Sequence, residues 1–238
     1  MGIPTCFIKI PFPAIWFIYS PKNMSIKLKP QSVILFQGDS ITDTGRSRQA
    51  VGPNHPEGLG YGYPRLISDH LMGGYPEHFL QIYNRGVSGD RIRDLAHRWE
   101  NESLRLLPNI LSILIGVNDT WNYLYMGMGS SPDDYKDVYQ NILQDTLIRL
   151  PDIHFVLCEP FVLITGEVTS EWMDDINQRR EFVKNLADEF NGVFVPFQSE
   201  LDKSALDIPP HKLLDDGVHP TDLGHRVLAD CWIKTVLG

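Results

Sequence analysis

Five short runs of apolar residues recur along the chain, and stretches with the spacing of amphipathic helices separate them. Short apolar runs bounded by turn residues are typical of buried strands in a parallel sheet. Strands that alternate with helices predict such a sheet covered by helices on both faces, most simply with five strands in a flavodoxin-like order. The runs lie at 33–36, 79–84, 109–115, 153–158 and 193–195, and the helical stretches at 63–71, 91–106, 133–150, 171–190 and 221–236.

Length, charge and cysteine content narrow the classes of protein. With 238 residues the chain is long enough to bury a sizeable core as one α/β domain. Its formal net charge of −9 gives a nucleic-acid partner no electrostatic support. Cys6, Cys158 and Cys231 form no C-x-x-C pair, which argues against a disulfide framework and a zinc knuckle. This cysteine pattern suits a reducing compartment, so we expect a cytoplasmic protein, with secretion as the less favoured alternative.

Residues 1–32 differ in character from the rest of the chain. Their apolar run at 12–19 is too short to span a bilayer, and five prolines argue against a long helix. The segment has one lysine before the apolar run and no A-x-A site after it, so it is a poor signal peptide, and Met24 offers an alternative start. We therefore expect a non-catalytic extension at 1–32, a single domain at 33–238 and no membrane partner.

Four polar, glycine-containing turns hold the residues that could carry chemistry. Three of them directly follow a predicted strand, and the fourth lies near the C-terminus. Because the carboxyl ends of parallel strands meet at one edge of a sheet, the first three turns should open there together, where open α/β sheets bind ligands. The turns are Gly38-Asp39-Ser40, Asn84-Arg85-Gly86, Gly116-Val117-Asn118-Asp119 and Asp216-Gly217-Val218-His219.

These turns contain the groups that nucleophilic catalysis by a serine requires. Such catalysis needs a hydroxyl, an imidazole that takes its proton and a carboxylate that orients the imidazole. Asp216 and His219 lie three residues apart, close enough to pair within one turn. A tetrahedral oxyanion needs neutral N–H donors. The backbone of Ser40, the backbone of Gly86, which has no side chain in the way, and the side chain of Asn118 are the candidates.

Taken singly, each motif has an ordinary structural explanation. Asp216 and His219 could form a loop hydrogen bond, Gly86 could relieve backbone strain, and Asn118 could belong to a turn or helix cap. The other seven histidines are interpreted as surface or packing residues. All four motifs occur at the expected places in one order, however, and this favours a shared catalytic site.

In that order the four motifs resemble the blocks of the SGNH (GDSL-type) hydrolases, from about residue 33 to the C-terminus. The resemblance implies a three-layer α/β/α sandwich and no metal or organic cofactor. It implies that Ser40 is the nucleophile, His219 the base and Asp216 the acid that orients it. It also implies an oxyanion hole formed by the backbone amides of Ser40 and Gly86 and the side chain of Asn118.

A narrower resemblance, to acetyl-xylooligosaccharide esterases, extends beyond the blocks. It implies hydrolysis of short acetyl esters on sugars through an acyl-enzyme on Ser40, a small acylated substrate as partner, an intracellular location and a homo-oligomer. We assign Asp39 and Trp121 to substrate binding, although core packing is the alternative for Trp121. The turn before His219, at 213–216, lacks an aromatic residue, which leaves acetate selectivity open. The stretches involved are 38–48, 60–63, 86–95, 98–99 and 116–121.

Other functions fit the sequence less well. A dinuclear phosphoesterase would need more histidines in the four motifs than this chain has. A Rossmann domain would need a G-x-G-x-x-G after a strand, and the chain has none. An α/β-hydrolase would need a G-x-S-x-G elbow, which is also missing. A non-catalytic module of the same fold would be expected to have lost one of the four family residues. The runner-up is a lysophospholipase or thioesterase for longer acyl chains, but the loops at 45–62 and 120–131 offer few apolar side chains.

Overall fold

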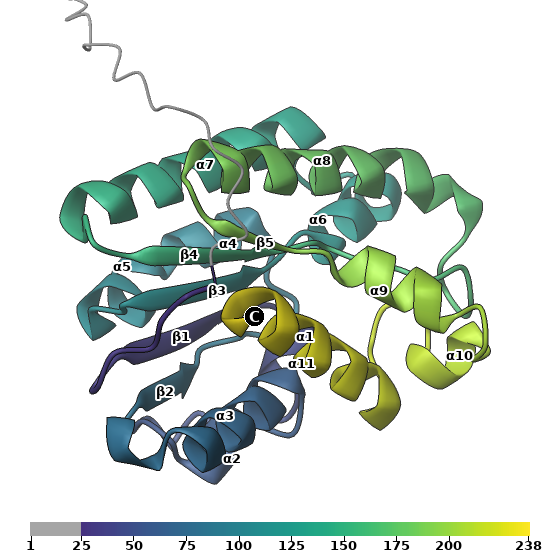
Figure 1. The fold of residues 1–238 in the computed structure, drawn as a ribbon. Coiled ribbons are helices and arrows are strands. Elements are labelled where there is room, and N and C mark those ends of the chain that lie inside the picture. Colours follow the sequence, from purple (N-terminus) through teal and green to yellow (C-terminus); the bar gives the residue numbers. More distant parts are fainter. Residues whose placement is uncertain (1–24) are drawn as a thin grey trace, which may run out of the picture.

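The computed structural model describes residues 25–238, and its centre is a parallel sheet of five strands in the order β2-β1-β3-β4-β5 (Figure 1). All four neighbouring pairs are parallel. This is the flavodoxin-like order, so the expected fold class is confirmed. The strands are β1 (Val33–Gly38), β2 (Gln81–Asn84), β3 (Ile110–Leu114), β4 (His154–Cys158) and β5 (Val193–Val195).

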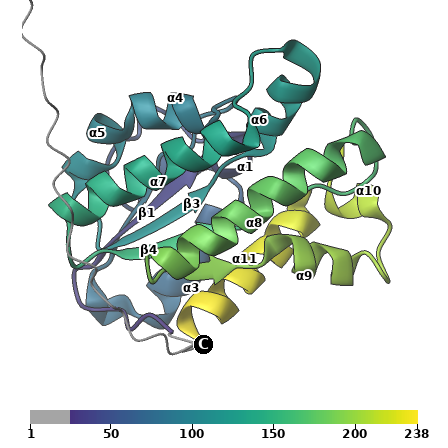
Figure 2. The same cartoon turned by 90° about the horizontal axis from the view of Figure 1, so that it is seen from above.

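Helices cover both faces of the sheet and make the three layers of the sandwich. The helices α3 (Tyr63–Gly74) and α11 (Asp222–Leu237) pack on one face, and α7 (Pro132–Arg149) and α8 (Met173–Glu189) lie over the other, as Figure 2 shows from above. Successive residues of β1 point to opposite faces: Phe36 joins the core under α3 and α11, whereas Leu35 joins the core under α7. Both faces of β1 are therefore buried, as its apolar sequence predicts.

The remaining helices are short and lie mostly in the connections. The α-helices are α1 (Ser40–Asp43), α2 (Pro56–Leu59), α4 (Ile92–His97), α5 (Trp99–Glu102), α6 (Val117–Trp121), α9 (Phe197–Ser204) and α10 (Pro210–Leu213). The 3-10 turns are η1 (Pro76–His78), η2 (Leu104–Leu106) and η4 (Ser170–Trp172), and η3 (Asn122–Met126) is a π-helical turn.

The spacing of residues 91–106 predicts one helix, and the structure corrects this prediction. It is divided into α4, α5 and η2, and Arg98, between α4 and α5, leaves helical geometry with φ −101° and ψ 4°. The Arg98 side chain donates to Asp90 Oδ2 at 2.6 Å and to Gln37 Oε1 at 2.7 Å. These tertiary bonds hold the chain close to the end of β1 and outweigh the helical spacing.

The expected N-terminal extension falls only partly within the described residues. Residues 1–24 lie outside them, and the domain boundary at residue 32 stays a prediction. Within the described part, Ile26 is buried in the core, and its N–H donates to the Val236 carbonyl of α11 at 2.7 Å. No helix within residues 25–238 has the length and apolar character needed to cross a membrane.

Candidate active site

The predicted site residues gather at the carboxyl edge of the sheet. Ser40 begins α1 directly after β1, and Asn118 lies in α6 directly after β3. The strand arrows in Figure 1 point to the side on which α1 and α6 lie. Asp216 and His219 occupy the turn that precedes α11. The parallel sheet thus brings together residues that are far apart in sequence.

Ser40, His219 and Asp216 form a continuous chain of hydrogen bonds. Ser40 Oγ lies 2.8 Å from His219 Nε2, and His219 Nδ1 lies 2.7 Å from Asp216 Oδ2. The other carboxylate oxygen, Asp216 Oδ1, accepts the backbone N–H groups of Val218 at 2.9 Å and His219 at 2.8 Å. Both oxygens of Asp216 are therefore engaged, and the ring of His219 is held with one nitrogen facing the serine.

The electrostatics of this turn favour an ionised aspartate. Partial burial raises the pKa of Asp216, but hydrogen bonds from the backbone and ring of His219 outweigh that effect and lower the pKa below its usual value. The side chains are 38% exposed for Asp216 and 50% exposed for His219, so the site is shallow and open to solvent.

A neighbouring loop that the sequence did not single out supports the Asp216–His219 turn. The N–H of Glu167 donates to the Asp216 carbonyl at 2.9 Å, and the N–H of Leu163 donates to the Gly217 carbonyl at 3.0 Å. Gly217 has φ +92°, and a Cβ there would collide with the Thr165 carbonyl. The glycine of this motif is thus required by backbone conformation and by close packing.

Asp39 is buried, which corrects its assignment to substrate binding. Its side chain caps α1, with Oδ1 accepting the N–H of Ile41 at 3.0 Å, and the residue is only 1% exposed. Burial raises the pKa of Asp39 to about 7, although the Ile41 bond and the charge of His219 lower it. Asp39 therefore orients the turn that carries Ser40 and does not face the substrate.

The assignment of Gly86 to the oxyanion hole is also corrected, because its N–H already donates a hydrogen bond within the protein. It donates to Asn84 Oδ1 at 2.9 Å, within the same buried turn. The Asn84 amide nitrogen in turn donates to the Thr42 carbonyl at 2.6 Å. A Cβ at Gly86 would collide with the backbone nitrogen of Asp43. Gly86 therefore allows the turn after β2 to pack tightly against α1, and its amide is not free for an oxyanion.

Gly89, three residues further along, has the properties expected of Gly86. It is exposed, its φ is +86°, and a Cβ there would meet no atom within 4 Å. Within residues 25–238 its N–H has no hydrogen-bond acceptor. Asn118 Nδ2 donates to the carbonyl of the next residue, Asp90, at 3.1 Å, which places this amide beside Gly89. The only signal in the sequence was a second glycine in the same turn.

Asp119, the last residue of its block, is a further residue whose role sequence reasoning missed. It is fully buried, and its Oδ2 accepts the N–H of Ile92 at the start of α4 at 2.9 Å. Burial raises the pKa of Asp119 to about 7, against the opposing charge of Arg179. The bond joins the Asn118 segment to the segment that follows Gly89.

Trp121 lies one helical turn beyond Asn118 and is half-buried. Its ring packs edge-on against buried Trp172, with centroids 5.4 Å apart, and against exposed Tyr125 at 5.6 Å. Both packing and a partly exposed surface are therefore present, and its assignment to substrate binding stays a prediction.

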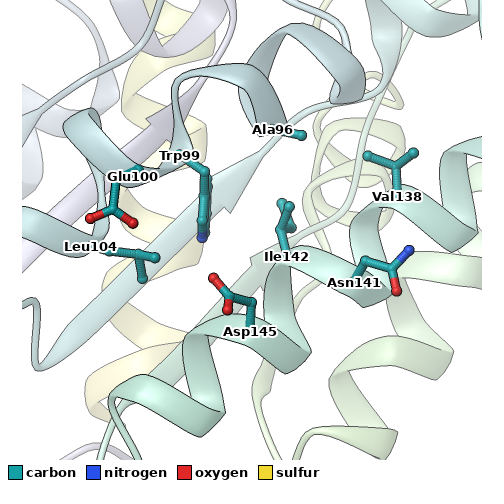
Figure 3. A pocket seen from close by; sticks show the side chains of 8 residues that line it. All are labelled: Ala96, Trp99, Glu100, Leu104, Val138, Asn141, Ile142 and Asp145. Atoms are coloured by element: carbon teal, nitrogen blue, oxygen red, sulfur yellow. The ribbon is translucent and has the colours of Figure 1, made fainter.

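A hollow of about 320 Å³ lies elsewhere, between α4, α5 and α7, and contains none of these residues (Figure 3). Its lining comprises Ala96, Trp99, Glu100, Leu104, Val138, Asn141, Ile142 and Asp145. Within the described part of the chain, no three His, Cys, Asp or Glu side chains are grouped to hold a metal ion.

Comparison with known proteins agrees with this geometry. Residues 36–227 match the model of the GDSL-like lipase/acylhydrolase family. The chain is 32% identical to a curated acetylxylan esterase from Geobacillus stearothermophilus, over 89% of this chain and 96% of that protein.

Solved structures show the same similarity. A GDSL-like lipase from Parabacteroides merdae has a TM-score of 0.87 and 39% identity, over 90% of this chain and 99% of its own. A mutant of an acetyl-xylooligosaccharide esterase from Geobacillus stearothermophilus has a TM-score of 0.81 and 31% identity, over 89% and 96% of the two chains. The expected family is confirmed: the chain belongs to the GDSL-like lipase/acylhydrolase family and is a carboxylic ester hydrolase.

Proposed function

We propose that this chain is a serine esterase that removes short acyl groups, chiefly acetyl, from sugars through an acyl-enzyme on Ser40. The observation that carries the proposal is the unbroken chain from Ser40 Oγ through His219 to Asp216, at 2.8 and 2.7 Å. His219 Nε2 takes the hydroxyl proton as Ser40 Oγ attacks the ester carbonyl, and Asp216 stabilises the imidazolium. His219 then protonates the departing alcohol, and water attacks the acyl-enzyme with His219 again as base.

The oxyanion of each tetrahedral intermediate is held by three N–H donors in this account. The backbone N–H groups of Ser40 and Gly89 have no acceptor within residues 25–238, and each lies in a turn fixed by other bonds. The side chain of Asn118 supplies the third, because its bond to the Asp90 carbonyl leaves one amide hydrogen free. Preorganised donors of this kind stabilise the transition state more than the ground state.

The relatives support both the catalytic residues and the substrate class. Three structures of the Geobacillus stearothermophilus acetylxylan esterase are described as catalytic mutants at a serine, an aspartate and a histidine. In that protein the serine and histidine are 179 positions apart, as Ser40 and His219 are here. We therefore assign O-acetyl groups on xylo-oligosaccharides as the substrate class of this chain, with Trp121 beside the acylated sugar.

The proposal is tested by acetate release from acetylated xylo-oligosaccharides, with the wild type, Ser40→Ala and an octanoyl ester compared in parallel. Rapid acetate release that depends on Ser40, with little octanoyl turnover, is the expected result. Octanoyl turnover without sugar deacetylation would support Ser40 as the nucleophile but contradict the assigned substrate class. The substrate would then be an ester with a longer acyl chain. Full activity of Ser40→Ala would contradict the mechanism itself.

A further inference from the structure

Asp43 joins the helix that carries Ser40 to the turn that carries Gly89. It is the last residue of α1, and its side chain is 8% exposed. Its Oδ2 accepts both the backbone N–H of Ser88 and the Ser88 hydroxyl, each at 3.0 Å. We propose that Asp43 is a positioning residue that aims the Gly89 N–H at the oxyanion, an inference that rests on the proposed function.

The backbone on either side of Gly89 is held, whereas Gly89 itself is not. On one side Asp43 fixes Ser88. On the other, the N–H of Asp90 donates to the Val87 carbonyl at 3.1 Å, and the Asp90 carbonyl accepts from Asn118 at 3.1 Å. A glycine has the widest conformational freedom of any residue, so its amide keeps one direction only if its neighbours impose it. The Asp43 carboxylate is the anchor on the Ser88 side.

The charge of Asp43 requires compensation, because a carboxylate near a forming oxyanion would oppose it. Two guanidinium groups provide this compensation. Arg48 Nη2 lies 3.3 Å from Asp43 Oδ2, and Arg46 Nε lies 3.9 Å from Oδ1. Arg46 Nε also donates to the Gly86 carbonyl at 2.6 Å, so it holds the same turn at a second point. Asp43 can therefore anchor the turn without leaving an uncompensated negative charge beside the site.

The test compares Asp43→Ala with Asp43→Asn in steady-state hydrolysis of p-nitrophenyl acetate. The alanine variant loses both bonds to Ser88, and we expect kcat to fall about 100-fold, as for loss of one oxyanion donor, with KM changed less than about threefold. The asparagine variant keeps a side-chain oxygen for the Ser88 N–H, so most of the lost kcat should return. An alanine variant with wild-type kcat would overturn the proposal, as would an asparagine variant no better than alanine.

A second pair of variants keeps the proposal falsifiable if Asp43→Ala does not fold. Ser88→Ala removes the hydroxyl bond to Asp43, whereas Ser88→Thr keeps a hydroxyl, and Ser88 is exposed, which leaves room for the methyl group. We expect kcat to fall about tenfold in the alanine variant only, since one of two bonds is lost. Equal kcat values in the two variants would overturn the proposal.

Covalent labelling separates positioning from folding. Ser40 attacks diethyl p-nitrophenyl phosphate, its proton passes to His219, and p-nitrophenolate leaves, so each folded active site is labelled once. Asp43→Ala should be labelled completely but more slowly, whereas a smaller labelled fraction at the wild-type rate would show a purely structural role and overturn the proposal. Ser131→Ala, which loses only the side-chain bond to the Asp134 N–H that caps α7, should label at the wild-type rate. A wild type that is not labelled at Ser40 would overturn the proposed function itself, and the inference with it.

Discussion

Asn84 Oδ1 accepts the N–H of Gly86 at 2.9 Å, and this bond decides which glycine of the turn can serve an oxyanion. An amide hydrogen that is already bonded within a buried turn cannot also bind substrate. We therefore assign the backbone N–H donor of this turn to Gly89. The two glycines then have separable functions, with Gly86 permitting close packing and Gly89 presenting its N–H.

We therefore predict opposite outcomes for the two glycine-to-alanine variants. Gly86→Ala forces a Cβ into the Asp43 backbone and should sharply lower the melting temperature. Gly89→Ala meets no atom, so it should cost only about 1–2 kcal/mol of stability for the left-handed φ while lowering kcat by shifting the amide. Thermal melts and kcat for both variants check this. A Gly86→Ala protein that is stable but inactive, together with a fully active Gly89→Ala protein, would show that Gly86 and not Gly89 donates its N–H to the oxyanion.

Asn118→Ala should lower kcat by about 100- to 1,000-fold with little change in KM, because the side-chain donor acts mainly on the oxyanion. Asn122→Ala is the matched control. It removes an amide of the same kind that donates to the Asn118 carbonyl at 2.8 Å and does not face the substrate in this account. Steady-state kinetics on p-nitrophenyl acetate should show a large loss for Asn118→Ala only. A similar loss in both variants would indicate that the segment as a whole, and not the Asn118 amide, is responsible.

Trp121→Ala should raise KM for acetylated xylo-oligosaccharides more than KM for p-nitrophenyl acetate, because only the former offers a sugar ring to the partly exposed indole. Tyr139→Phe is a suitable control, since Tyr139 is fully buried in the core on the α7 face of the sheet. Its KM values should stay unchanged. If KM for the two substrates changes by the same factor in Trp121→Ala, the residue acts by packing against Trp172 and not by sugar contact.

His225 should make the fold sensitive to acid. Burial lowers the pKa of His225 to about 4, with the charge of Asp222 opposing the shift, and its Nδ1 accepts the N–H of Tyr63 at 3.2 Å. The unfolded chain takes up a proton near the ordinary pKa of 6.5. Stability is therefore present above pH 6.5 and lost as the pH falls towards 4, by up to about 3 kcal/mol.

Denaturant unfolding of wild type and His225→Gln at several pH values between 7.5 and 4 checks this expectation. The variant should be less stable than the wild type at pH 7.5 but should lose less stability on acidification. Parallel pH dependences for the two proteins would show that other groups cause the acid sensitivity.

The features that could be predicted from the sequence are those that depend on local pattern. The inner strands β1, β3 and β4 were recognisable because both of their faces are largely buried and their sequences are mostly apolar. The pairing of Asp216 with His219 followed from a separation of three residues. A threonine directly before a helix is a common N-cap, and Thr221 Oγ1 does accept the N–H of Gly224 at 3.1 Å. Each of these depends on neighbours along the chain.

The features that could not be predicted depend on contacts between distant segments. The occupied amide of Gly86 requires the orientation of Asn84, which bonds in turn to Thr42. The burial of Asp39 depends on the packing around α1, and the helix break at Arg98 depends on its bonds to Gln37 and Asp90. The cytoplasmic location and the homo-oligomer stay predictions.

The most direct test of the central claim is mass spectrometry of the protein rapidly quenched in acid during turnover of p-nitrophenyl acetate. We predict one acetyl group per chain on the peptide that contains Ser40, and none in Ser40→Ala. Sustained turnover with no acetylated Ser40 peptide, or with the acetyl group on another residue, would contradict the acyl-enzyme mechanism.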